Sequence, residues 1–211
     1  MYTDRQLKII AVLKSADGWM SGSLLRENIG VSSRTLQMDI KAINKNIFTL
    51  CKSFGIEPVV TLSHFEMPWY LAKEKGGFAN REVIDDFVRY ACCVMNYFKE
   101  EVHYWLLFNE INFGVMPMGA YNSLGLIDWK YHSGEAFISL KSMTVDEKVR
   151  FQALHHQFVA GAKTVIEARK ISPEIKVGCM IGHITQYPLT CRPEDMLECQ
   201  HKDRLINKFV V

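Results

Sequence analysis

The chain has 211 residues, of which 48% are hydrophobic and 23% charged, with 25 Lys and Arg against 23 Asp and Glu. This composition is typical of a globular protein with one large or two small domains. No run approaches the roughly 18 apolar residues of a membrane span, and the polar start is unlike a secretory signal. We therefore expect a cytoplasmic protein without a membrane partner, in which the cysteines are free thiols.

The first 50 residues differ in composition from the rest of the chain. They hold seven basic and four acidic residues, a net charge of +3, and none of the prolines, cysteines or histidines. No Gly-, Pro- or Ser-rich linker follows them. We therefore predict two domains, residues 1–47 and residues 48–211, joined by continuing secondary structure.

Three helices are predicted at the start of the chain. Thr3 and Gln6 form a capping box ahead of an amphipathic helix over residues 4–14. Ser21 can cap a second, short helix, and Gly30 marks the turn that follows it. A third helix with a polar face comes next. Together, the three helices make the pattern of a helix-turn-helix DNA-binding domain.

The third helix is predicted to be long. Its cap is Ser32 or Ser33. Apolar residues then recur at intervals of three and four without a helix breaker, which predicts one continuous helix from about Ser33 to Phe54. These apolar residues are Ile40, Ile43, Ile47, Leu50 and Phe54.

The segments RQLKII (5–10) and VSSRTLQMDI (31–40) resemble the small N-terminal helix-turn-helix domain of bacterial sugar-responsive and phosphotransferase-linked regulators. The resemblance implies a recognition helix that contacts duplex DNA. The residues expected to face the DNA are Ser33, Arg34, Thr35, Gln37 and Lys41. That family continues into a β-hairpin wing, which residues 45–50 do not encode. The alternative is a helical cap with a solvated basic face.

The remainder of the chain alternates strands and helices. Short apolar runs predict strands over residues 57–64, 104–110 and 176–181. One long helix is predicted after Asn80, and a second begins at a capping box formed by Thr144 and Glu147 and ends before Pro173. The order βαβαβ with nearly continuous apolar strands predicts an α/β fold with a parallel sheet covered by helices.

Polar side chains stand at the end of each predicted strand or just after it. They are His64, then Asn109 with Glu110, and then His183. In parallel α/β sheets the functional groups collect beyond the carboxyl ends of the strands. Glu110 directly follows an apolar strand, so it is a candidate general acid, and a solvated loop carboxylate is the alternative.

Several segments resemble glycoside hydrolase family 1, the retaining β-glycosidases. They are GIEPVVTLSHFEMP (55–68), GGFANR (76–81), FNEIN (108–112), LHHQFVA (154–160) and YPLTCRPED (187–195). The motifs HFEMP and NEIN are similar to those of the 6-phospho-β-glucosidase branch of this family. The resemblance implies part of a (β/α)8 TIM barrel, with strands that resemble the third to the fifth.

The resemblance also implies roles for individual residues. Glu110 would be the acid/base of a double displacement on a β-glycoside or 6-phospho-β-glucoside, while Asn109 would bind the sugar 2-hydroxyl and His64 the 3-hydroxyl. Glu66 is a candidate for orienting its loop. The segment from Phe113 to Met143 would form a loop at the aglycone entrance.

Neither a cofactor nor a metal site is expected, because Cys191, Cys199 and His201 lack the spacings of a zinc site. Retaining chemistry uses two carboxylates about 5–5.5 Å apart, and we find only the acid/base in these residues. We therefore predict that the chain alone hydrolyses no glycoside and that open sheet edges favour self-association. The alternatives are a DNA-binding regulator with a barrel-derived sensing or dimerising body, and a gene-remodelling product without a selected activity.

Overall fold

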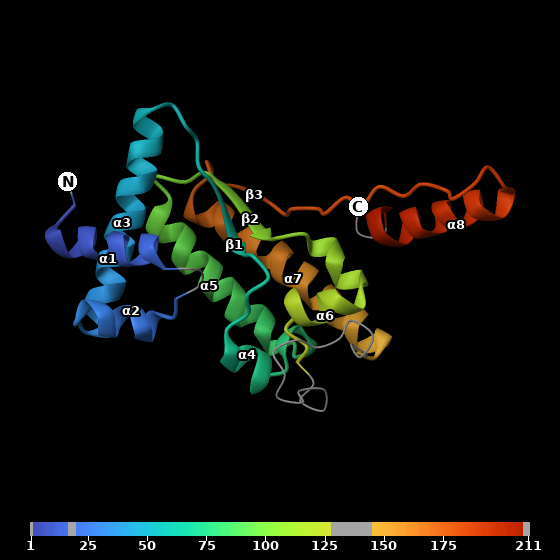
Figure 1. Ribbon diagram of the computed structural model, residues 1–211, viewed down its shortest axis with the longest axis horizontal. Coiled ribbons are helices and arrows are strands. Elements are labelled where there is room, and N and C mark those ends of the chain that lie inside the picture. Colours follow the sequence, from blue (N-terminus) through green and yellow to red (C-terminus); the bar gives the residue numbers. More distant parts are fainter. Residues whose placement is uncertain (1, 17–19, 128–144, 209–211) are drawn as a thin grey trace. The chain divides into compact units, whose positions relative to one another are not determined.

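The computed structural model describes residues 2–16, 20–127 and 145–208 (Figure 1). The chain divides into two compact units, Met1–Pro58 and Val59–Val211. No helix among the described residues is long and apolar enough to cross a membrane. All six cysteines are free, as predicted.

The first unit consists of the helices α1 (Asp4–Ser15), α2 (Gly22–Ile29) and α3 (Ser33–Ser53). The predicted capping box is present, because the Gln6 backbone N–H donates to the Thr3 hydroxyl at 3.3 Å and the Thr3 N–H donates to the Gln6 side chain at 3.1 Å. Side-chain hydroxyls also cap the other two helices. The predicted continuous third helix is confirmed, and no wing interrupts it.

An apolar cluster holds the three helices together. It consists of Ile9, Leu25, Ile29, Leu36 and Ile43. Ile9 is fully buried, so α1 supplies the centre of this core. The last of these residues on α3 is Ile43, which lies half-way along the helix. The second half of α3 therefore contributes no buried residue to the first unit.

The second unit contains a parallel sheet of β1 (Val59–Ser63), β2 (Tyr104–Phe108) and β3 (Lys176–Gly178), in that spatial order. Val59 pairs with Tyr104, which pairs in turn with Lys176. The parallel βαβαβ arrangement is confirmed. The third strand is shorter than predicted, because its regular register with β2 ends at Gly178 and not at residue 181.

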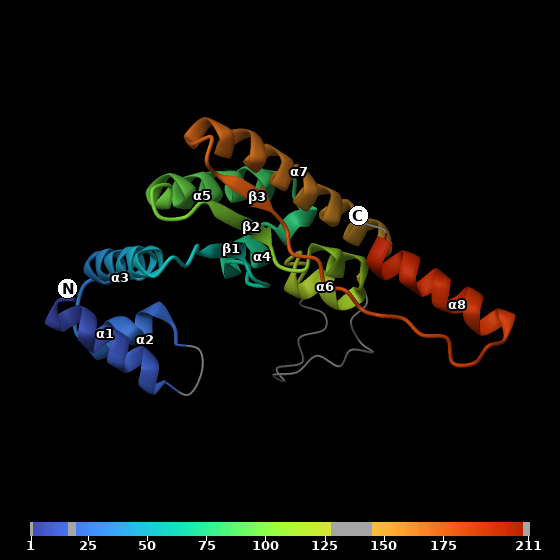
Figure 2. The ribbon, with the colours of Figure 1, turned by 90° about the horizontal axis from the view of Figure 1, so that it is seen from above.

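Two long helices, α5 (Glu82–Phe98) and α7 (Glu147–Ile171), cover one face of this sheet (Figure 2). The Phe87 ring of α5 stacks on Phe108 of β2 with 4.5 Å between ring centroids. Such aromatic pairs stabilise a core beyond the area that they bury. The α5–β2 contact therefore anchors the strand end that carries Asn109 and Glu110.

The ends of α7 agree in part with the prediction. The helix stops at Ile171, before Pro173, as predicted. Thr144, the predicted cap, lies outside the described residues. Asp146 caps the helix, and its carboxylate accepts hydrogen bonds from Lys148 N at 2.8 Å and Val149 N at 3.3 Å.

Short helical elements connect the strands and follow the sheet. They are α4 (Trp69–Lys73), η1 (Gly77–Ala79), η2 (Ile111–Val115), α6 (Pro117–Asn122), α8 (Pro193–Asp203) and a final π-helical segment, η5 (Arg204–Lys208). The segment expected to form a loop from Phe113 onward contains η2 and α6 in its first part, and its place at an aglycone entrance stays a prediction. Its later part, including residues 128–143, lies outside the described residues.

Candidate functional site

The carboxyl ends of the three strands meet, as the sequence predicts. The backbone N–H of Asn109 donates to Ser63 O at 2.9 Å, which ties the end of β2 to the end of β1. On the other side, Met180 N donates to Phe108 O and Ile111 N donates to Met180 O, both at 3.0 Å. Hydrogen bonding thus continues past the regular strands and holds the residues around Glu110 from both sides.

The backbone is strained at this edge of the sheet. Among the described residues, Phe65 and Glu110 are the only non-glycine residues with a positive φ, of 70° and 43°. A left-handed conformation costs about 1–3 kcal/mol in residues that carry a side chain, and it persists only where the surroundings enforce it. Phe65 directly follows His64, and its ring stacks on Phe113 at 6.1 Å. Both strained residues therefore flank the predicted sugar-binding positions.

The carboxyl group of Glu110 lies against Gly182. A Cβ atom at Gly182 would be 3.0 Å from Glu110 Oε1 and 3.1 Å from Cε1 of Phe113. A side chain at this position would rarely tolerate such short distances, so the absence of a Cβ at Gly182 provides the space that the half-buried Glu110 carboxyl group occupies. Sequence reasoning missed Gly182, although it directly precedes His183, which was noted as a polar residue near a strand end.

The side chain of Asn109 is buried and only partly satisfied. The residue exposes 4% of its surface, and its Oδ1 has no hydrogen-bond partner among the described residues. A buried acceptor without a partner costs about 1–3 kcal/mol. A ligand hydroxyl that donates to Oδ1 would remove this cost.

Asn112 fixes the segment that contains Gly182. It is fully buried, and its Nδ2 donates to Gly182 O at 2.7 Å and to Ile206 O at 3.1 Å. Gly182 N donates back to Asn112 Oδ1 at 2.9 Å. These bonds hold Gly182 against the carboxyl group of Glu110. Sequence reasoning missed this role, although Asn112 closes the NEIN motif.

The other predicted residues of this edge are exposed. His64 and His183 both face solvent. The Glu66 carboxylate accepts the backbone N–H of His64, with both oxygens at 2.9 Å, a contact that fits the expectation that Glu66 orients the loop. No group of three or more His, Cys, Asp or Glu side chains within residues 2–16, 20–127 and 145–208 could hold a metal ion.

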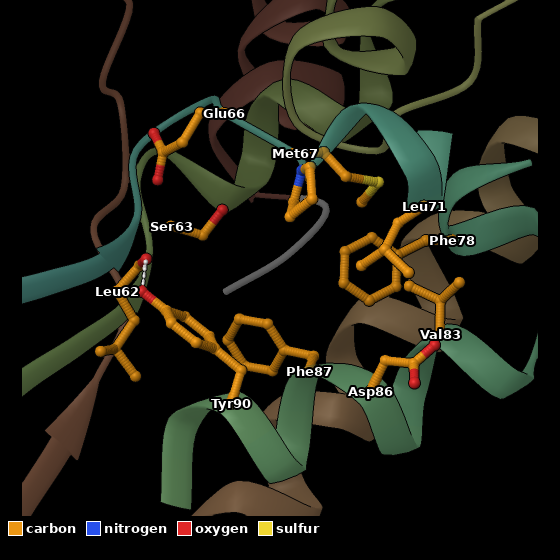
Figure 3. Close-up of a pocket in the computed structure, with 11 residues that line it drawn as sticks. Leu62, Ser63, Glu66, Met67, Leu71, Phe78, Val83, Asp86, Phe87 and Tyr90 are labelled. Atoms are coloured by element: carbon orange, nitrogen blue, oxygen red, sulfur yellow. Dashed lines mark hydrogen bonds between the residues drawn. The ribbon is translucent and has the colours of Figure 1, made fainter. Parts of the chain in front are cut away.

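A pocket of about 270 Å³ lies beside β1 (Figure 3). Glu66 lines it, but His64, Asn109 and Glu110 do not. Leu62, the α4 region and α5 supply its apolar walls, and Tyr90 donates from its hydroxyl to Leu62 O at 3.2 Å. Burial raises the pKa of Tyr90. We assign the pocket no part in sugar binding, because Asn109 and Glu110 do not line it.

The predicted DNA-contacting residues lie at the start of α3. Ser33, Arg34, Gln37 and Lys41 are exposed, whereas Thr35 is half-buried and its hydroxyl bonds to that of Ser32 at 2.8 Å. A polar contact also joins α2 to α3, because Arg26 Nη1 donates to Ser33 Oγ at 3.5 Å. The start of α3 thus presents mainly exposed polar side chains.

An ion pair fixes α3 against α1. Arg5 Nε lies 2.5 Å from Asp39 Oδ2, and its Nη2 donates to Oδ1 at 3.1 Å. Asp39 is buried at 5% exposure, whereas the Arg5 side chain is half exposed. The hydrogen bonds from Arg5 hold the pKa of Asp39 below its usual range.

Comparisons with known proteins identify two segments. Residues 41–211 match the model of glycosyl hydrolase family 1, and residues 5–53 match a helix-turn-helix (HTH) domain model. The 6-phospho-beta-glucosidase AscB of Escherichia coli is 38% identical over 163 residues, which are 77% of this chain and 31% of AscB. The aryl-phospho-beta-D-glucosidase BglA of Bacillus subtilis is 40% identical over 159 residues, which are 75% of this chain and 31% of BglA.

Solved structures show the same fold. A family 1 β-glucosidase from Thermotoga maritima has a TM-score of 0.61 at 25% identity, over 81% of this chain and 34% of that protein. The chain thus spans about a third of the length of the relatives that it matches. The partial TIM barrel and the helix-turn-helix domain are both confirmed. The chain belongs to glycosyl hydrolase family 1 and carries a helix-turn-helix domain at the start of its sequence.

Proposed function

We propose that this chain carries the acid/base half of a retaining β-glycosidase active site of the 6-phospho-β-glucosidase kind. Glu110 is the acid/base, Asn109 binds the sugar 2-hydroxyl and His64 binds the 3-hydroxyl. The main support is the strained, doubly anchored backbone at the end of β2. There Glu110 directly follows Asn109, whose Oδ1 has no hydrogen-bond partner in the part of the chain that the structure describes. Similarity to phospho-β-glucosidases, named for such substrates, supports the substrate class.

The chemistry proceeds in two displacements. Glu110 first donates its proton to the glycosidic oxygen while the bond between that oxygen and the anomeric carbon breaks and a carboxylate nucleophile bonds to the carbon. Glu110 then takes a proton from water, whose oxygen displaces the nucleophile. The sugar 2-hydroxyl would donate to Asn109 Oδ1 throughout.

The nucleophile, in this proposal, is not among these 211 residues. Glu66 is a poor substitute, because both of its carboxylate oxygens accept the His64 N–H in its own loop. A polypeptide of this sequence should therefore release no 4-nitrophenol from 4-nitrophenyl 6-phospho-β-glucoside. Any turnover above that of a Glu110→Gln variant would contradict this part of the proposal.

The role of Glu110 can be tested in a complete barrel. The family 1 segment of this chain would replace the matching segment of the E. coli relative, and hydrolysis would be compared with Glu110→Gln and with Glu174→Gln, an exposed control. Loss of the general acid should lower kcat by about a hundredfold or more on substrates with poor leaving groups. Azide needs no general base, so it should restore turnover of the nitrophenyl substrate and form a glycosyl azide. Equal activity of the two variants would refute the assignment.

We also propose that the first domain, residues 1–47, binds duplex DNA. The helix-turn-helix match and the exposed polar start of α3 favour this function, and the apolar core of the domain is complete at Ile43. The contacts are made by Ser33, Arg34, Thr35, Gln37 and Lys41. Without a wing the phosphate contacts are few, so binding should be weak and should fall with salt.

The DNA function is tested by fluorescence anisotropy with a labelled duplex at several salt concentrations. A double Arg34→Ala, Lys41→Ala variant should reduce the slope of log affinity against log salt by about two. Lys14→Ala is the control, because Lys14 is an exposed lysine on another helix, in the last turn of α1. An unchanged slope in the double variant would contradict the assignment.

We propose, finally, that copies associate through the sheet. The spatial order β1-β2-β3 leaves one edge of β1 and one edge of β3 unpaired among the described strands, and such edges favour pairing with another chain. Sedimentation velocity over a concentration series should show a rising mean mass. A constant monomer mass up to the highest concentration would rule this out.

A further inference from the structure

The exposed face of α3 within the helix-turn-helix domain is regular. Arg34, Gln37, Met38 and Lys41 are spaced i, i+3, i+4 and i+7, which places them on one side of the helix. All four are exposed. Leu36, Asp39 and Ile43, the buried residues of this helix, are offset from them and pack into the domain.

Met38 differs from its neighbours on this face. It exposes 63% of its surface, although it is apolar and lies between an amide and two cationic side chains. A single exposed apolar residue is common and needs no explanation by itself. Its position at the centre of the predicted DNA-contacting face gives it a specific chemical meaning.

We propose that Met38 contacts the C5-methyl group of a thymine in the major groove. This inference rests on the proposed DNA binding and adds a base preference to it. In the major groove, thymine is distinguished by its O4 acceptor and its methyl group, and apolar side chains recognise the methyl. Methionine suits this contact because its unbranched, polarisable thioether adapts to the surface that it meets.

The neighbouring residues complete the preferred site. Gln37 can bond in a bidentate manner to adenine N6 and N7, and an adenine pairs with thymine. Gln37 and Met38 are adjacent, so they can recognise the two bases of one A·T pair or of neighbouring pairs. Arg34, one turn earlier, matches O6 and N7 of guanine. The class of ligand is therefore duplex DNA in which a G·C pair lies close to an A·T pair.

The experiment replaces thymine by uracil, which removes only the methyl group. A preferred duplex is first selected from a random pool with the full chain, and each thymine of that duplex is then changed to uracil in turn. Loss of contact with one methyl group should weaken binding about three- to fivefold at one position. Met38→Ala should bind the thymine and uracil duplexes equally.

A matched control separates this contact from general loss of apolar surface. Leu50 lies in the same helix and is 56% exposed, but it is twelve residues further on, about 18 Å along the axis. Leu50→Ala should keep the thymine preference of the unchanged chain. Both substitutions are at exposed positions, and circular dichroism would verify that the helices are retained.

The outcomes distinguish this inference from the proposed function. Absence of any binding to duplex DNA at low salt would refute DNA binding and this inference with it. Binding without a difference between thymine and uracil would refute only the contact with the methyl group. The contact with the methyl group would also be refuted if the Met38→Ala variant still distinguished thymine from uracil, whether or not its binding to both duplexes were weaker.

Discussion

The Asn112 side chain gives the sharpest test of how the strand ends are held. Its amide exchanges two hydrogen bonds with the backbone of Gly182 and donates a third to Ile206 O. All of these bonds join segments at least 70 residues apart in the chain. Asn112 exposes none of its surface, so water cannot replace a bond that is lost.

The magnitude follows from these three bonds. Asn112→Ala removes all of them and leaves one N–H and two carbonyl oxygens without that partner. At about 1 kcal/mol for each bond, and more for each group left buried and unsatisfied, the free energy of unfolding should fall by about 3–5 kcal/mol. Asn112→Asp keeps the shape and the acceptor, but its carboxylate faces two carbonyl oxygens, so the loss at pH 7 should be at least as large.

Urea unfolding, followed by tryptophan fluorescence and by amide exchange of Gly182, would measure this loss. Asn96→Ala is the control, because Asn96 is exposed on α5 and its removal should change stability by less than about 0.5 kcal/mol. An Asn112→Asp variant within about 1 kcal/mol of the unchanged chain would show that the shape of the side chain matters and its donors do not.

Three further outcomes are expected. Because Arg5 lowers the pKa of folded Asp39, the ion pair stabilises the first domain above the unfolded pKa of about 3.9, and this stability is lost as the pH falls through the folded value. Asp39→Asn should therefore make the thermal melting temperature depend less on pH between pH 6 and 2.5, and an unchanged pH dependence would contradict this. Gly119→Ala should destabilise the second unit by about 3 kcal/mol in urea unfolding, because the new Cβ would collide with a backbone carbonyl, whereas Gly22→Ala, with open space around it, should change stability by less than about 1 kcal/mol. A chain cut after residue 47 keeps the whole apolar cluster of the first domain, so it should retain cooperative helical melting by circular dichroism, and a melt without cooperativity would argue against this boundary.

Local patterns predicted much of the fold because their causes are local. The capping box of Thr3 and the apolar spacing along α3 depend on residues three or four positions apart, and both were confirmed. The parallel order of the strands followed from the alternation of strands and helices. The cytoplasmic location stays a prediction.

The details around Glu110 could not be predicted in the same way. Its left-handed backbone, the room left by Gly182 and the bonds of Asn112 depend on the return of a segment about 70 residues later. A pattern of apolar residues indicates which face of an element is buried, but not which backbone groups meet it. The end of β3 was misplaced for the same reason, because the regular register with β2, which ends at Gly178, determines where the strand stops.

The predicted domain boundary lies inside α3, in the part of this helix where the two family matches overlap. The helix-turn-helix match extends to residue 53 and the family 1 match begins at residue 41. The first half of α3 buries Leu36 and Ile43, whereas Ile47 and Leu50 in its second half are 43% and 56% exposed. A recognition helix and a barrel helix both bury apolar residues at intervals of three and four. One uninterrupted periodicity therefore satisfies both folds, which is why spacing predicts the helix correctly but cannot assign its second half to either domain.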